Sequence, residues 1–178
     1  MKPERNKKPR LPLEKATLEQ LALSYVGRYA TTKAKLASYL GRKLRERGWG
    51  GSNAPEIEPL VERLAELGYL DDRAFASARA ASLQRRGYGE RRVAQALYAA
   101  GIDAEDSAEA RNQSRSGALA AGLRFAERRR IGPFASAHPD REARQKAMAA
   151  MMRAGHPLDI VRRIVDAEPG KVPESDTD

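Results

Sequence analysis

The sequence has few of the residues on which catalysis and metal binding most often depend. It contains no cysteine and two histidines, His138 and His156, each directly before a proline. Without cysteine there is no disulfide and no thiolate metal site. Both histidines precede expected helix starts, where a turn or capping role is the simpler interpretation. With no Walker loop or dinucleotide fingerprint either, we predict a protein that is not an enzyme and has no metal and no cofactor.

Long apolar runs and strand-like segments are also missing. No segment approaches the roughly 20 apolar residues that cross a bilayer, and no hydrophobic signal-peptide segment follows the basic N-terminal residues. We therefore expect a cytoplasmic protein with no membrane partner. Aromatic residues make up 6% of the chain, and alanine, leucine, arginine and glutamate dominate without alternating β-branched runs. This composition predicts an all-α protein.

Positive charge is the property in excess. Lysine and arginine number 33 against 24 aspartates and glutamates, which gives a formal net charge of +9. Such an excess favours an anionic partner, which is a nucleic acid, an acidic protein surface or an anionic lipid. Charge alone does not choose among the three.

Apolar residues recur at three- and four-residue steps in a series of helix-length segments. Glycines close three of these segments at nearly equal spacing, since 53 residues separate Gly48 from Gly101 and 54 separate Gly101 from Gly155. The spacing predicts three tandem three-helix modules.

The pattern also sets expected boundaries. We predict a disordered basic arm over residues 1–16, three-helix modules over 17–70, 71–114 and 115–167, and a disordered acidic tail over 168–178. The sixth helix, expected from about Ala104, has the poorest apolar pattern. Only Ala108 and Ala110 fall on its expected core face, so its order stays open.

The most distinctive segment is a predicted corner between two helices. Glycine tolerates the left-handed conformation that ends a helix, and two consecutive aspartates can cap the amides of the next one. An aromatic ring then returns to the core one turn later. The corner comprises Gly68, Tyr69, Leu70, Asp71, Asp72 and Phe75.

This corner, the basic segment 85–93 and the pair Gly101-Ile102 together resemble the RecX family, bacterial regulators of the RecA recombinase filament. The similarity extends over roughly residues 18–166. It implies an elongated, curved array of the three modules, acting as a monomer that lies in the groove of the RecA filament. It also implies modulation, which we predict to be inhibition, of ATP hydrolysis, filament growth and strand exchange, and hence of recombination, DNA repair and the SOS response.

Basic residues on helices and turns are the candidate contacts for this filament or for DNA, either directly or through the filament. For any one cluster the alternative is a solvated charged face. The candidates are Lys35, Arg42, Lys43 and Arg45 in the first module, Arg85, Arg86, Arg91 and Arg92 in the second, and Arg128, Arg129, Arg130, Arg141, Arg144 and Lys146 in the third.

Two aromatic residues between or beside glycines are candidate stacking residues. Trp49 and Tyr88 lie in expected turns, where their rings can be exposed to a partner. By contrast, Tyr39 and Tyr98 fall on apolar stripes and are assigned to the core.

Two alternative functions remain open. The chain can act as a stand-alone nucleic-acid-binding module, or as an adaptor for another acidic protein. Helix-turn-helix DNA readers are also three-helix units with a basic last helix. Here the third helix of the first module is acidic, with Glu58 and Glu62 among its residues against the single Arg63. This argues against base reading by that helix.

Overall fold

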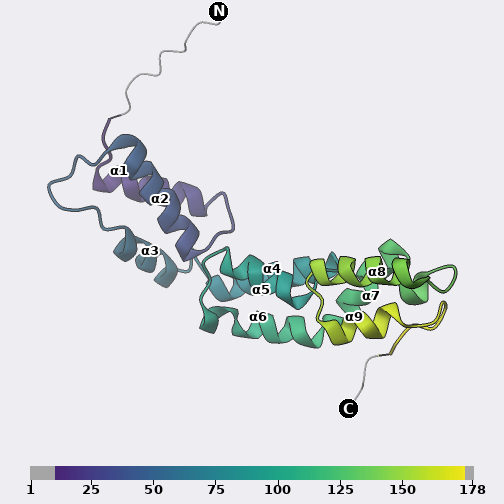
Figure 1. Cartoon of the computed structure of the whole chain (residues 1–178). Helices are drawn as coiled ribbons and strands as arrows, with labels where there is room; N and C mark the ends of the chain where they lie inside the picture. Colours follow the sequence, from purple (N-terminus) through teal and green to yellow (C-terminus); the bar gives the residue numbers. More distant parts are fainter. Residues whose placement is uncertain (1–10, 175–178) are drawn as a thin grey trace, which may run out of the picture. The chain divides into compact units, whose positions relative to one another are not determined.

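The computed structural model describes residues 11–174, which form nine α-helices. Within this range the only strand-like pairing is an isolated bridge between Leu13 and Trp49. The chain divides after Asp71 into two compact units, here called unit 1 and unit 2 (Figure 1). The helices are α1 (Lys15–Val26), α2 (Lys33–Arg47), α3 (Ile57–Glu66), α4 (Asp72–Arg85), α5 (Glu90–Tyr98), α6 (Ala104–Ser116), α7 (Ala118–Arg129), α8 (Arg141–Arg153) and α9 (Leu158–Val165), with a 3-10 turn, η1 (Gly132–Phe134), after α7.

The all-α prediction is confirmed for the described residues, and the helices group in threes. Gly48, Gly101 and Gly155 follow α2, α5 and α8, the middle helix of each group. The repeat seen in the sequence is therefore a repeat of three-helix modules. The curvature of the array stays a prediction.

Unit 1 is built on the facing apolar stripes of α1, α2 and α3. Its buried core includes Leu18, Leu36, Leu40, Leu60 and Leu64. The Thr32 hydroxyl caps α2 by accepting a hydrogen bond of 3.2 Å from the amide of Lys35. These contacts account for a small bundle whose helices are amphipathic in sequence.

The segment before α1 corrects the predicted arm over residues 1–16. Leu13 is fully buried in the core of unit 1. Its amide donates to the Gly48 carbonyl and its carbonyl accepts from the Gly50 amide, both at 2.9 Å. Two leucines, Leu11 and Leu13, among prolines and basic residues were too weak a signal to predict this pairing. Residues 1–10 lie outside the described part of the chain.

The corner after α3 has the predicted helix ending. Gly68 has a φ of 79°, and the amide of Tyr69 donates to the Leu64 carbonyl while that of Gly68 donates to Ala65, both at 2.9 Å. This is the hydrogen-bond pair of a Schellman motif. Leu70 is buried in unit 1, and α4 begins at Asp72, whose side chain is buried in unit 2. Phe75 packs against the core of the second module but is only half-buried.

In the first half of unit 2, α4 packs against α5 and most extensively against α6. The buried face of α6 consists of Ser107, Ala110 and Ser114, whereas Ala108 is exposed, contrary to prediction. Two of these three positions are serines, so the apolar pattern did not reveal the face. The helix is nonetheless well formed, because small side chains allow α6 to lie close to α4.

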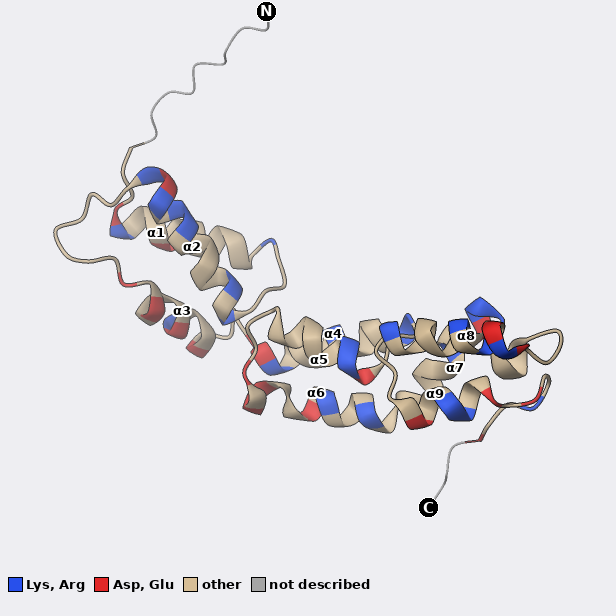
Figure 2. Ribbon diagram, in the orientation of Figure 1, with Lys and Arg blue, Asp and Glu red and all other residues tan. Residues whose placement is uncertain are grey.

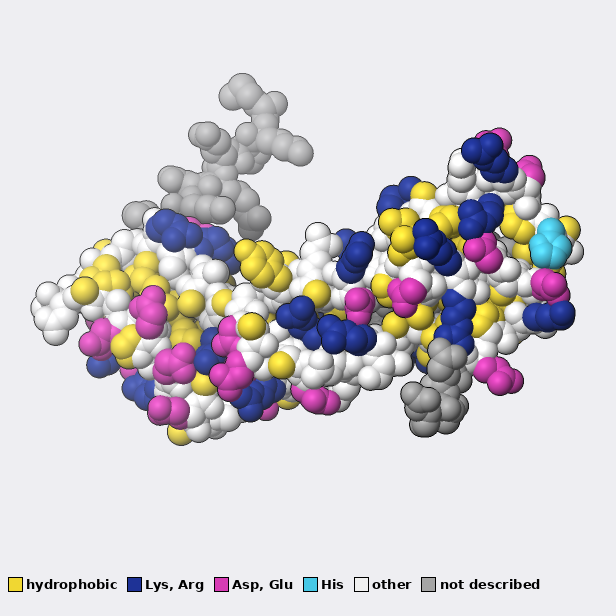
Figure 3. Space-filling model, turned by 60° about the horizontal axis from the view of Figure 1, so that its bottom comes forward, with side chains coloured by type: hydrophobic (Ala, Val, Ile, Leu, Met, Phe, Trp, Pro, Cys, Tyr) yellow, Lys and Arg dark blue, Asp and Glu magenta, His cyan; other side chains and the backbone are white. Residues whose placement is uncertain are grey.

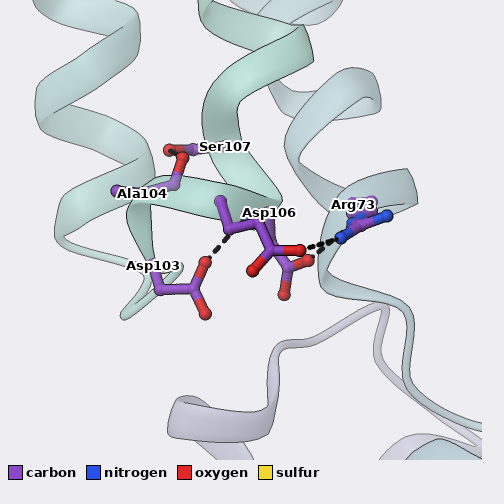
Figure 4. A network of polar contacts seen from close by, with 6 residues as sticks. Arg73, Asp103, Ala104, Asp106 and Ser107 are labelled. Carbon is purple, nitrogen blue, oxygen red and sulfur yellow. Dashed lines mark hydrogen bonds and ion pairs between the residues drawn. The ribbon is translucent and has the colours of Figure 1, made fainter.

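The start of α6 is held by side-chain bonds (Figure 4). The Asp103 carboxylate accepts a hydrogen bond of 2.8 Å from the Asp106 amide, which caps the helix. Arg73 of α4 donates to Asp106 and to Glu105, each at 2.7 Å. The Arg73 side chain is therefore bound to the helix that it faces.

The second half of unit 2 contains α7, η1, α8 and α9. Its buried core includes Phe125, Met151, Val161 and Ile164. After α9, the predicted acidic tail over 168–178 differs from the structure in its described part. The Gly170 amide donates to the Pro133 carbonyl at 2.8 Å, which fixes this segment against η1. Residues 175–178 lie outside the described residues.

The two halves of unit 2 are joined by main-chain hydrogen bonds, here called the junction. The Gly89 amide donates to the Ala154 carbonyl at 3.0 Å, and the Arg91 amide donates to the Gly155 carbonyl at 3.1 Å. A Cβ atom on Gly89 would overlap the backbone of Gly155. The α4–α5 turn and the α8–α9 turn therefore lie in direct backbone contact.

His156 adds a side-chain bond to the junction. The ring is fully buried and its Nε2 lies 3.1 Å from the Gly87 carbonyl oxygen. Because a carbonyl only accepts, Nε2 carries the proton in this arrangement. Nδ1 is buried without a hydrogen-bond partner among the described residues. Burial lowers the pKa of His156 below its ordinary value, which favours the neutral ring in the folded protein.

The close backbone approach predicts a large cost for a single methyl group. Gly89→Ala should lower the free energy of unfolding by about 1 to 3 kcal/mol, since the backbone at Gly155 must shift to admit it. Gly41→Ala is the matched control, because its Cβ would meet only ordinary van der Waals contacts, with Arg45 of α2 and Ile57 of α3. There we expect a gain of roughly 0.4 to 1 kcal/mol. Urea unfolding of both variants measures the two changes in the free energy of unfolding. Equal changes would contradict the close approach of Gly89 to the Gly155 backbone.

The buried imidazole predicts a stability that depends on pH. Below about pH 6.5 the unfolded chain protonates His156 while the folded chain resists it, so the free energy of unfolding should fall as the pH falls. Urea unfolding between about pH 7.5 and 5 measures this loss. Most carboxylates titrate at lower pH, so they contribute little in this range. The loss should be smaller in His156→Gln and unchanged in His138→Gln, whose ring is exposed. An identical pH dependence in all three proteins would contradict the assignment.

Candidate interface for an anionic partner

A concave surface of about 490 Å³ lies at the junction of unit 2 and is here called the junction groove. It brings together four arginines and two aromatic rings from both halves of the unit. The lining residues are Arg86, Tyr88, Phe125, Arg128, Arg129, Ala150, Arg153 and Ala154. Four of them, Arg86, Tyr88, Arg128 and Arg129, are candidate contacts predicted from the sequence.

The arginines of the groove come from the ends of three helices. Arg86 follows α4, Arg128 and Arg129 lie in the last turn of α7, and Arg153 ends α8. Cations are favourable at helix C-termini, where the carbonyl groups carry partial negative charge. The junction places these three helix ends next to one another, so charges far apart in the sequence face one concavity. Figure 2 shows the lysines and arginines along the helices of unit 2.

Two rings support the guanidinium groups. The Arg86 guanidinium lies 5.4 Å from the centre of the Tyr88 ring, and that of Arg129 lies 5.5 Å from the centre of Phe125. Cation–π contacts of this kind restrict the side chains without neutralising their charge. The Arg128 side chain also donates to the Arg86 carbonyl across the junction. Figure 3 shows cationic side chains lying among hydrophobic ones on one face of unit 2.

None of the four groove arginines forms an ion pair with another described residue. By contrast, Arg73 of the same unit is paired with Asp106 at 2.7 Å. Four like charges at one concavity repel each other, and an anionic ligand relieves that repulsion. The groove can therefore bind phosphates or carboxylates without any catalytic group.

The basic cluster predicted in the first module is partly neutralised. Arg42 and Lys43 both bind Glu46, at 3.2 and 2.7 Å. The pKa of Glu46 is lowered, mainly by the hydrogen bond from Lys43 and further by the charges of both cations and the bond from Arg42. Arg45 and Lys35 have exposed side chains on the same helix. This cluster belongs to unit 1, so it is described separately from the junction groove.

The six residues predicted as the third basic cluster divide into two groups. Arg144 donates to both carboxylate oxygens of Asp166, at 2.6 and 2.8 Å, and this bond raises its pKa while lowering that of Asp166. Lys146 pairs with Glu142 at 2.5 Å. Arg141 begins α8, roughly 18 Å along the helix from Arg153. These three residues do not line the groove, and Arg130, just after α7, does not line it either.

The remaining predicted contacts of the second module lie beside the groove rather than in it. Arg85, Arg91 and Arg92 are exposed. The Arg92 guanidinium lies 5.9 Å from the centre of the Tyr88 ring and its Nη1 donates to Gln95 at 3.2 Å. The Arg91 amide is engaged in the junction.

The aromatic predictions need correction. Trp49 is half-buried against the core of unit 1, and its Nε1 donates to the Asn53 carbonyl at 2.5 Å. Tyr88 is half-buried and packs against the cores of both halves of unit 2. Neither ring is the freely exposed side chain that was predicted. Conversely Tyr98, assigned to the core, is 84% exposed in the last turn of α5.

Besides the two alanines, the sequence analysis missed two groove residues, Phe125 and Arg153. Phe125 lies on the buried face of α7 and also forms a wall of the groove. Arg153 stands two residues before a helix-closing glycine, as Arg85 does before Gly87. A basic residue just before such a glycine is the signal that could have found it.

Within residues 11–174 no group of three metal-ligating side chains is found. A separate finding is that none of the helices in this range is long and apolar enough to cross a membrane.

Charge reversal tests the groove as an anion-binding surface. Arg129→Glu combined with Arg153→Glu should weaken binding to a DNA oligonucleotide and reduce the slope of log affinity against log salt by about 1 for each lost phosphate contact. Neither side chain makes a hydrogen bond to another described residue, so helicity should persist. The control, Arg79→Glu with Arg111→Glu, changes the net charge equally at exposed sites of α4 and α6. Equal losses in both double variants would contradict a localised site.

The chain is similar in sequence to proteins of one known family. Residues 71–110 match the model of the second three-helix domain of RecX. The regulatory protein RecX of Myxococcus xanthus is 33% identical over 176 residues, covering 94% of each chain, and that of Agrobacterium fabrum is 28% identical over 138 residues, covering 75% of this chain and 73% of the relative.

Solved structures share the fold. A crystal structure of regulatory protein RecX superposes with a TM-score of 0.65 at 20% identity, over 85% of this chain and 71% of that one. RecX from Lactobacillus salivarius gives 0.64 at 17% identity, over 85% and 94%. The predicted resemblance is thus confirmed, and the chain belongs to the RecX family of non-enzymatic regulatory proteins.

Proposed function

We propose that this protein binds the RecA nucleoprotein filament and inhibits its ATP hydrolysis, its growth and strand exchange. Through these steps it would regulate recombination, DNA repair and the SOS response in the cytoplasm. Membership of the RecX family supports RecA as the partner. The observation that carries the proposal in the structure is the junction groove, in which four arginines without acidic partners surround one concavity.

The mechanism needs binding alone. A filament presents acidic side chains and DNA phosphates along its length, and the net charge of +9 attracts the protein to both. The junction then offers its cations at fixed spacing, because two main-chain bonds join the halves of unit 2. A protein bound as a monomer in the filament groove would obstruct subunit movement and the entry of a second DNA strand.

Assays with RecA test this proposal. Stoichiometric amounts of the full chain should lower DNA-dependent ATP hydrolysis and strand exchange, since the bound protein occupies the filament groove. The Arg129→Glu, Arg153→Glu variant should inhibit less than the Arg79→Glu, Arg111→Glu control at equal concentration.

If RecA activity is unchanged by the wild-type protein while DNA binding persists, the proposal fails. The chain would then act as a stand-alone nucleic-acid-binding module. If the protein binds neither RecA nor DNA, the remaining hypothesis is that it is an adaptor for another acidic protein.

A further inference from the structure

Three tyrosines of unit 1 form a cluster that the proposed function does not use. The rings of Tyr25 and Tyr39 are stacked, with centres 4.2 Å apart and planes 20° from parallel. Tyr29 lies against Tyr25, with centres 5.3 Å apart. We call these three residues the tyrosine cluster. They come from α1, from the turn after it and from α2.

Cations surround this cluster at a second concave surface of about 420 Å³. Its lining residues are Ser24, Tyr25, Arg28, Tyr29, Tyr39, Arg42 and Lys43. The Arg42 guanidinium and the Lys43 ammonium lie 5.5 and 5.8 Å from the centre of the Tyr39 ring. Glu46 pairs with both of these side chains, and Arg28 adds an exposed third cation. The surface is therefore cationic, with one carboxylate at its edge.

Packing explains two of the tyrosines but not the third. Tyr25 and Tyr39 are half-buried and pack against the core of unit 1. Tyr29 is 58% exposed and is not part of that core. Its backbone amide nevertheless donates to the Tyr25 carbonyl at 3.1 Å, and its ring packs against that of Tyr25. An aromatic ring held at a cationic concavity while most of its surface faces solvent is available to a ligand.

The combination of a ring face and cations matches one class of ligand. Unpaired bases stack on exposed aromatic rings while the neighbouring phosphates contact Lys and Arg. Bases in a duplex are already stacked and paired, so they cannot use the ring in this way. The pairing of Arg42 and Lys43 with Glu46 weakens the electrostatic attraction of this surface for phosphates. Base stacking is therefore the interaction that would make the surface prefer single strands to duplexes.

We propose that the tyrosine cluster is a binding site for single-stranded nucleic acid, with a base stacked on Tyr29 and the adjacent phosphates at Arg28, Arg42 and Lys43. The site lies wholly in unit 1 and is independent of the junction groove. The inference also goes beyond the proposed function, since it does not require RecA. Its test is therefore made without RecA.

The experiment measures fluorescence anisotropy of a labelled oligothymidine titrated with the full chain. Tyr29→Ala should weaken binding roughly 5- to 150-fold, the range expected for the loss of one stacked base. Tyr29→Phe keeps the ring and should bind within about twofold of wild type, because stacking does not need the hydroxyl. Tyr98→Ala is the matched control, since it removes another exposed tyrosine that lies in unit 2.

Two further measurements separate stacking from charge. Binding to a duplex of equal length should change little in Tyr29→Ala, because paired bases do not reach the ring. The salt slope for oligothymidine should also be unchanged, since the substitution removes no cation. The proposal is overturned if Tyr29→Ala binds oligothymidine like wild type, if Tyr98→Ala loses as much affinity, or if duplex binding falls equally.

Discussion

The arrangement of unit 2 depends on two main-chain hydrogen bonds, those from the amides of Gly89 and Arg91 to the carbonyls of Ala154 and Gly155. They form only because residue 89 has no side chain, which lets one helix-connecting turn reach the backbone of another. Buried His156 adds a bond to Gly87 at the same place. Packing of α4 against α7, and of Tyr88 against the cores of both halves, adds to these contacts.

The junction explains why arginines from three helix ends share one concavity. Two arginines that link helices of unit 2, Arg73 and Arg144, are neutralised by aspartates. The groove arginines instead lie over aromatic rings or in solvent, without ion pairs in the described part of the chain. Their charge is therefore not neutralised within the described residues and remains available to a partner.

Local patterns in the sequence predicted the helices and their ends, because apolar periodicity and closing glycines such as Gly48, Gly101 and Gly155 act over a few residues. They failed where burial depends on distant partners. Leu13 is buried by residues of the α2–α3 loop, and α6 uses serines that look polar in isolation. Tyr98 fits an apolar stripe but nothing covers it among the described residues. The arginines that the sequence predicted as contacts do lie on the surface. Which of them face the junction groove depends on the junction, which joins residues more than 60 positions apart in the sequence.

Amide hydrogen exchange at Gly89 and Arg91 tests most directly whether the two halves of unit 2 form one rigid body. If they do, both amides should exchange as slowly as that of Val93, whose side chain is fully buried in the core beside them, because all three open only when unit 2 unfolds. Exchange of Gly89 and Arg91 at the rate of unprotected amides, while Val93 stays protected, would show that the modules separate in solution. The junction groove would then not be a preformed surface.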